Sequence, residues 1–129
     1  MVKRYFKQPI KLFGLFAFGA VALSACKRET EFDKLTMVSY TASIAPIISS
    51  NCAFSGCHGD SLTQKFKLTT YEGLMNGGIK PGKPNESELY KSLKSLNDED
   101  VMPRRPYNPL SEKQIQLIYV WIGQGAKNN

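Results

Sequence analysis

The sequence predicts an all-α fold, a small bundle of short helices joined by long loops. Apolar residues recur at the three- and four-residue spacing of a helix face in each candidate element. A Ser, Thr or Asn opens most of these elements, with Glu or Gln three residues later, which is the pattern of a helix N-cap. No stretch alternates apolar and polar residues as a half-buried strand does, so helices are the only regular elements expected.

The first residues of the chain predict export. A basic start is followed by an apolar run over residues 12–23, which is typical of a signal peptide and too short to span a bilayer comfortably. The run ends in Leu-Ser-Ala-Cys, similar to a bacterial lipobox, so we expect residues 1–25 to be removed and Cys26 to carry a lipid. An ordinary secretory signal beside a free thiol is the alternative.

Two further segments follow the signal. Residues 26–39 are rich in charge and poor in apolar residues, which favours a flexible tether between the lipid and the domain. Residues 40–129 are expected to form the single domain.

Processing changes the charge of the chain. The net charge is +6, but residues 1–25 hold four of the seventeen basic residues and no acidic one, which leaves +2 after their removal. A charge this small, without a basic block interleaved with aromatic residues, argues against nucleic-acid binding.

The first helix is expected over residues 43–51. Ile44, Ile47 and Ile48 share one apolar face, and Pro46 falls in the first turn, where its missing N–H costs nothing.

Two short helices are expected in the middle of the chain. Thr69 and Glu72 have capping-box spacing for the first, and an Asn-Gly-Gly run ends it at residues 76–78. Asn85 and Glu88 have the same spacing for the second. The apolar stripe of this second helix comprises Leu89, Leu93 and Leu96.

The last helix has the clearest signals. Ser111 and Gln114 form a capping box, and Leu110 with Ile115 forms a hydrophobic staple. Its apolar face comprises Ile115, Ile118, Tyr119 and Ile122, widened by Leu117 and Trp121.

Two cysteines and the only histidine of the chain fall within seven residues, as Cys52, Cys57 and His58. Covalent haem attachment uses two thiols that reach the vinyl groups of one porphyrin edge, followed at once by a histidine that reaches the iron. The usual spacing is C-x-x-C-H, whereas this chain has C-x-x-x-x-C-H. The pattern therefore predicts a haem site with a widened thiol loop.

A second iron ligand would have to come from a methionine, since no other histidine exists. Met102 is the favoured candidate because Pro103 holds it on a stiff, extended segment. Met75 has the helical phase of a core residue, and Met37 falls in the expected tether. An open sixth position remains the alternative.

The residues 52–58, the Met102-Pro103 pair, and the Pro-Leu-Ser run that leads into Ile-x-x-Trp-Ile-x-x-Gly-Ala resemble a class I-type cytochrome c domain of exported bacterial proteins and lipoproteins. The resemblance covers about residues 40–129. It implies a cytochrome c-like bundle around one covalent haem c, thioethers from Cys52 and Cys57, His58 as proximal ligand and Met102 as distal ligand. It also implies electron transfer to redox partner proteins from a membrane-anchored domain facing the periplasm or cell exterior, without enzyme activity or a small-molecule substrate.

The two additional residues between the thiols keep other interpretations open. Cys52 and Cys57 could form a disulfide in a haem-free binding or structural lipoprotein. With His58 they could bind zinc, although a fourth ligand is missing. A pentacoordinate haem sensor or enzyme becomes the choice if Met102 does not bind. Arg104 and Arg105 could bind haem propionates or simply face water.

Overall fold

The computed structural model describes residues 30–61 and 66–129. Over these residues the chain is helical and contains no strand, which confirms the all-α prediction. The expected signal peptide and Cys26 lie outside the described residues. Within the described part, no helix is long and apolar enough to cross a membrane.

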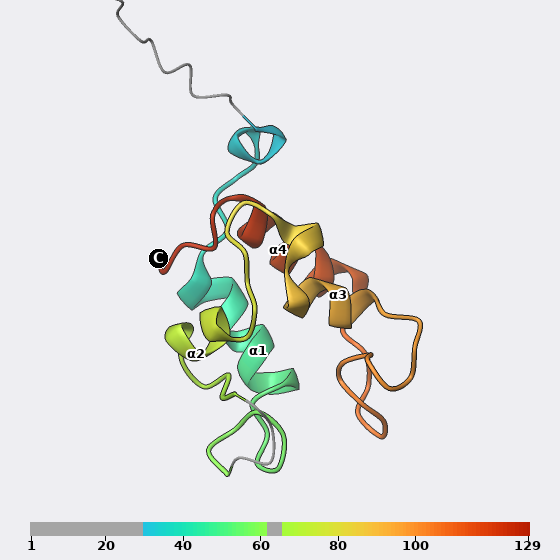
Figure 1. The fold of residues 1–129 in the computed structure, drawn as a ribbon. Helices are drawn as coiled ribbons and strands as arrows, with labels where there is room; N and C mark the ends of the chain where they lie inside the picture. Colours follow the sequence, from blue (N-terminus) through green and yellow to red (C-terminus); the bar gives the residue numbers. More distant parts are fainter. Residues whose placement is uncertain (1–29, 62–65) are drawn as a thin grey trace, which may run out of the picture.

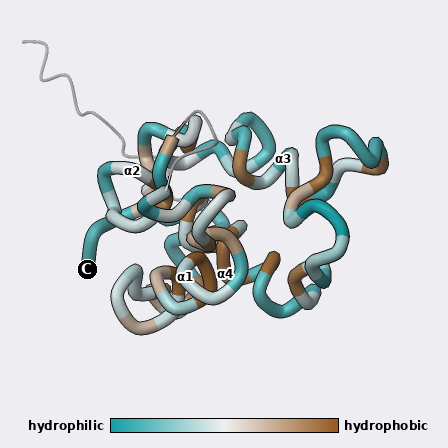
Figure 2. Tube along the Cα trace, turned by 90° about the horizontal axis from the view of Figure 1, so that it is seen from below, coloured by the Kyte–Doolittle hydropathy of each residue, from teal (hydrophilic) through white to brown (hydrophobic). Residues whose placement is uncertain are grey.

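The core includes side chains of α1 (Ala45–Asn51) and α4 (Glu112–Gly123), whose hydrophobic stretches gather near the centre of the molecule in Figure 2. Trp121 is only 1% exposed, and its indole N–H donates to the Lys127 carbonyl at 2.9 Å. The other large apolar side chains that are almost fully buried are Ile44, Ile48, Leu74, Ile118 and Ile122. The apolar faces predicted for the first and last helices therefore pack against each other.

α4 is the helix that the sequence predicted best. Ser111 accepts from the Gln114 N–H at 3.3 Å, and Gln114 accepts in return from the Ser111 N–H at 2.9 Å. Both members of the expected staple, Leu110 and Ile115, are buried. The signals hold because all of them are local to one turn of the chain.

The start of the first helix was predicted three residues too late. A π-helical turn, η2 (Tyr40–Ile44), precedes α1, and the Ser39 hydroxyl caps it by accepting from the Ala42 N–H at 3.2 Å. The Tyr40 N–H donates to the Asn129 side chain at 2.9 Å, so the start of η2 is tied to the end of the chain.

α2 (Tyr71–Asn76) lies where the sequence predicts it, but its cap is different. Thr70 is the N-cap, and its hydroxyl accepts from the Gly73 N–H at 3.0 Å. The expected capping box of Thr69 with Glu72 is therefore wrong by one residue.

Both expected ends of the third helix are wrong. Pro84 starts a 3-10 turn, η3 (Pro84–Glu86), so α3 (Glu88–Lys94) begins later than Asn85. α3 then ends at Lys94, because Ser95 has extended backbone (φ −63°, ψ 139°). Leu96, predicted on the apolar stripe, is instead fully exposed.

Residues 30–38, which we call the N-terminal strap, pack against the end of α4 although a flexible tether was expected there. The strap contains the short turn η1 (Glu31–Lys34), and the Phe32 ring lies 5.5 Å from the Tyr119 ring. A Cβ atom at Gly123 would lie 2.5 Å from the Phe32 ring, so glycine is needed for this contact.

Gln124, the residue after α4, joins the same strap by its amide group. Its side-chain oxygen accepts from the Val38 N–H at 2.9 Å, and its NH2 group donates to the Thr36 carbonyl at 3.0 Å. The same NH2 group lies 3.3 Å from the carbonyls of Phe32 and Leu35. Within the described residues, contacts with α4 therefore already begin at Phe32, inside the segment expected to be a tether.

The strap and two long loops lie at opposite ends of the molecule. Figure 1 shows the strap, in blue, at the upper end beside the end of α4. The loop after α1 (residues 52–61) and the loop after α3 (residues 95–109) lie at the lower end. These two loops carry most of the predicted site residues.

Candidate functional site

A cavity of about 610 Å³ lies between the loop after α1 and the segment that includes α3 and the loop after it. We call it the thiol cavity, because Cys52 and Cys57 line it together with His58. Its other lining residues include Phe54, Phe66, Leu68, Leu74, Leu89, Leu93, Met102, Pro103, Arg104, Arg105 and Tyr107. The volume falls within the roughly 300–1,000 Å³ of sites that enclose a small molecule or cofactor.

The widened thiol loop, residues 52–59, is closed by one carbonyl group. The Phe54 carbonyl accepts from the Cys57 N–H at 3.0 Å and from the Gly59 N–H at 2.9 Å. Gly56 has a φ of +82°, a left-handed conformation that glycine adopts without strain. The extra residues therefore form a tight turn, and both cysteines still line the same cavity.

Gly59 has a second role in this turn. A Cβ atom there would lie 2.7 Å from the carbonyl carbon and oxygen of Phe54, closer than real contacts allow. Any larger residue would force the carbonyl away from the two N–H groups that it binds. The sequence analysis gave Gly59 no role.

His58 is held with one ring nitrogen bonded to the backbone. Its Nδ1 lies 2.9 Å from the Phe66 carbonyl, which can only accept, so Nδ1 carries the proton. This tautomer leaves Nε2 as the unprotonated nitrogen, the form that binds a metal. The His58 ring also stacks on the Phe66 ring, with centroids 4.9 Å apart and planes 17° apart.

Phe66 was missed by the sequence analysis. It contacts His58 through both its ring and its carbonyl, yet it lies eight residues further along the chain in a stretch with no periodic pattern. No local motif marks a carbonyl as the partner of an imidazole, so this contact could be found only from the structure.

Cys52 and Cys57 are both free thiols in the structure. Within the described residues, no three His, Cys, Asp or Glu side chains are arranged to hold a metal ion.

Burial raises the pKa of the Cys52 thiol to about 11, and the nearby Cys57 adds to the shift. Since the thiolate is the reactive form, Cys52 is expected to react slowly in the folded, haem-free chain. In a Cys26→Ser variant at pH 8, its alkylation by iodoacetamide should be about 100-fold slower than after unfolding in urea, in proportion to the thiolate lost. Mass spectrometry of the Cys52 peptide checks the rate, and equal rates in the two states would contradict the buried position.

The structure places the three candidate methionines in different surroundings. Met102 lines the thiol cavity, and its N–H donates to the Ser92 carbonyl of α3 at 3.0 Å. Met75 packs against the hydrophobic core, and Met37 is half exposed on the strap. Of the three, only Met102 lines the same cavity as His58.

Arg104 and Arg105 also line the thiol cavity, and both side chains are largely exposed. The Arg104 guanidinium donates to the Glu99 carbonyl at 2.7 Å. The loop therefore carries two cations at the edge of an otherwise mostly apolar cavity.

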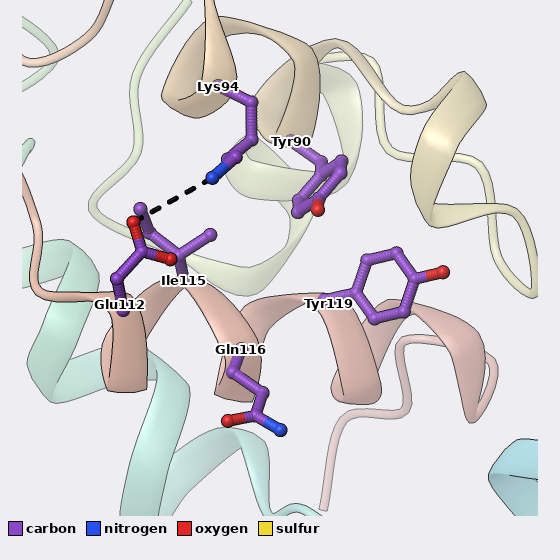
Figure 3. Close-up of a pocket in the computed structure, with 6 residues that line it drawn as sticks. All are labelled: Tyr90, Lys94, Glu112, Ile115, Gln116 and Tyr119. Carbon is purple, nitrogen blue, oxygen red and sulfur yellow. Dashed lines mark ion pairs between the residues drawn. The ribbon is translucent and has the colours of Figure 1, made fainter.

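A second, smaller hollow of about 240 Å³ lies between α3 and α4. Figure 3 shows Lys94 reaching from α3 toward Glu112, with Nζ and Oε1 3.7 Å apart, while Gln116 points away from α3. The rings of Tyr90 and Tyr119 lie beside each other with centroids 4.9 Å apart. This hollow shares no residue with the thiol cavity and contains no thiol, imidazole or thioether.

The thiol cavity thus brings together two thiols, an imidazole whose Nδ1 is bonded to the backbone, a thioether and two guanidinium groups on a mostly apolar wall. Trp121 belongs to the core and does not line it. Comparisons with protein-family models, curated proteins and solved structures find no match for this chain.

Proposed function

We propose that this chain is a one-electron carrier that holds a single haem c in the thiol cavity. The observation that carries the proposal is the cavity itself, because it gathers the Cys52, Cys57 and His58 side chains with Met102 from a distant loop. These are the two thiols, imidazole and thioether that a covalent, six-coordinate haem uses.

The residues present fit this group in chemistry and surroundings. Cys52 and Cys57 would form the thioether bonds, while Nε2 of His58 and the sulfur of Met102 would hold the iron. The Phe66 carbonyl fixes the imidazole tautomer and increases its basicity as a ligand. Arg104 and Arg105 can bind the propionates, since a guanidinium fork matches a carboxylate.

When bound, the haem iron accepts and releases one electron between Fe(III) and Fe(II). The chain contributes a thioether ligand, which favours reduced iron, and an apolar wall that limits access of water. Both effects raise the reduction potential. Gain and loss of an electron change no bond in a substrate, so we propose no enzyme activity. The proposed partners are other redox proteins.

We further propose that the domain is exported and attached to a bacterial membrane by a lipid on Cys26. The support is the lipobox-like Leu-Ser-Ala-Cys run after an apolar segment. A diacylated cysteine with a further acyl chain supplies the multiple anchors that stable attachment requires.

One experiment tests both parts of the proposal. The full chain is produced in a bacterial host with haem c maturation, and membrane and soluble fractions are run on a denaturing, reducing gel stained for haem peroxidase activity. We expect a haem-positive band in the membrane fraction. Cys26→Ser should move this band to the soluble fraction, and Cys52→Ser with Cys57→Ser should abolish it.

The single variants Cys52→Ser and Cys57→Ser serve as matched controls. Each should leave one vinyl group free, which shifts the α-band of the reduced pyridine haemochrome to longer wavelength. A colourless wild-type protein would refute the haem proposal. A wild-type spectrum with one free vinyl group would show that only one thioether forms, and a Cys52→Ser variant with the same spectrum would identify Cys52 as the cysteine that does not bind.

A further inference from the structure

Two aromatic rings join the two walls of the thiol cavity. Phe54, between the two cysteines, stacks on Tyr107, which lies five residues beyond Met102. Their centroids are 5.0 Å apart and their planes differ by 12°. Both residues line the thiol cavity. The stack therefore connects the thiol loop directly with the loop that carries Met102.

The thiol loop can support such a contact because its backbone is fixed around Phe54. The Phe54 carbonyl is the acceptor for the N–H groups of Cys57 and Gly59 at 3.0 and 2.9 Å. Phe54 is one of the four residues between Cys52 and Cys57. The turn that its carbonyl closes therefore fixes the backbone that carries the ring.

Apart from the stack, the loop that carries Met102 is held by hydrogen bonds and not by buried side chains. No residue from 94 to 109 is buried, whereas Leu93 and Leu110 on either side of this stretch are. The Met102 N–H is bonded to Ser92 of α3, and the Tyr107 N–H closes a turn onto the Arg104 carbonyl at 3.1 Å. Tyr107 itself is 44% exposed, so its ring gains its packing from Phe54 and not from the core.

We propose that the Phe54–Tyr107 stack is a positioning device that holds Met102 in the thiol cavity and keeps external ligands from the sixth position of the iron. The inference rests on the proposed haem site. It assigns Phe54 and Tyr107 as positioning residues, neither of which touches the iron. Phe54, from the segment between the two cysteines, supplies the ring that reaches the distal loop.

The stack requires an aromatic ring at residue 107 but not its hydroxyl group. Tyr107→Ala removes the ring, while Tyr107→Phe keeps it and removes only the hydroxyl. Because Tyr107 is largely exposed and lies outside the core, neither change should prevent folding. Phe54→Leu keeps an apolar side chain in the thiol loop and removes the stack from the other side.

The first readout is hydrogen exchange of the Met102 backbone amide in the full chain, held in detergent. Loss of an aromatic pair should speed its exchange about two- to tenfold in Tyr107→Ala and in Phe54→Leu, the factor that the energy of such a pair corresponds to. The double variant should show no further increase, since both changes remove the same contact. Tyr107→Phe should exchange at the wild-type rate.

The second readout is the rate of carbon monoxide binding to the reduced haem protein, which requires Met102 to leave the iron. It should rise by about the same two- to tenfold factor in Tyr107→Ala and Phe54→Leu, and not in Tyr107→Phe. If the Met102 amide exchanges at the wild-type rate in Tyr107→Ala and Phe54→Leu, the proposal is overturned, whether or not haem is bound. Faster exchange with an unchanged carbon monoxide rate would overturn the ligand-positioning role. Absence of haem from the wild-type protein would instead refute the proposed function, a result that the haem-stained gel detects separately.

Discussion

Replacing Met102 by alanine is expected to abolish the weak sulfur-to-iron charge-transfer band of the oxidised protein. Met102 is the thioether that lines the thiol cavity together with His58, so its loss leaves the sixth position without a protein ligand. The reduction potential should fall by on the order of 0.1 V, since axial ligands set haem potentials over about 0.8 V. Redox titration followed by absorbance measures the fall, and the reduced variant should bind carbon monoxide rapidly.

Met75→Ala is the matched control for this prediction. Met75 packs against the core and does not line the thiol cavity, so the variant should lose stability while keeping both the band and the potential. If the band disappears in Met75→Ala and persists in Met102→Ala, the ligand assignment is wrong. If the wild-type protein has no such band and binds carbon monoxide at once, a pentacoordinate sensor or enzyme becomes the better proposal.

Trp121→Ala is expected to have the largest effect on stability. The ring is 1% exposed, packs 5.8 Å from the Tyr40 ring and donates to the Lys127 carbonyl at 2.9 Å. Truncation of a buried Trp costs about 3–5 kcal/mol, because the cavity that remains refills only in part. A domain of roughly ninety residues has about 5–13 kcal/mol of stability in total. Urea unfolding followed by far-ultraviolet circular dichroism should show a large fall in the midpoint.

Two variants calibrate that result. Trp121→Phe keeps most of the apolar volume and loses the hydrogen bond, so it should cost clearly less than Trp121→Ala. Leu96→Ala should change the free energy of unfolding by no more than about 0.5 kcal/mol, since the side chain is fully exposed. A cost for Leu96→Ala similar to that for Trp121→Ala would mean that residue 96 belongs to the core, as the helical pattern alone predicted.

The contrast between α4 and α3 shows which parts of the fold can be predicted from local sequence. In α4 the cap, the staple and the apolar face all favour the same boundaries, and the structure agrees. In α3 the leucine spacing extends to Leu96, but the helix ends before it. The start of α3 also differs from the prediction. The buried Ser87 hydroxyl accepts from the Lys80 N–H and donates to the Lys83 carbonyl, and residue spacing does not reveal these tertiary contacts.

The candidate site divides in the same way. Cys52, Cys57, His58 and Met102 were recognised because their residue types are rare and chemically specific, and the structure brings all four to one cavity. The supporting contacts were not recognised. The Phe66 carbonyl that holds His58 and the Tyr107 ring that meets Phe54 use ordinary groups, and only the fold determines which of many such groups lies nearby.

The contact of the N-terminal strap with α4 limits the distance between the folded domain and a lipid on Cys26. Residues 27–31 separate Cys26 from Phe32, whose ring contacts Tyr119 of α4. Since a chain extends at most about 3.6 Å per residue, a lipid on Cys26 would keep Phe32 within about 22 Å of its attachment point. The strap lies at the end of the molecule opposite the loops of the thiol cavity (Figure 1). If the proposed lipid and haem are present, the loops of the thiol cavity would lie at the end of the domain away from the lipid attachment, where a proposed redox partner could reach them.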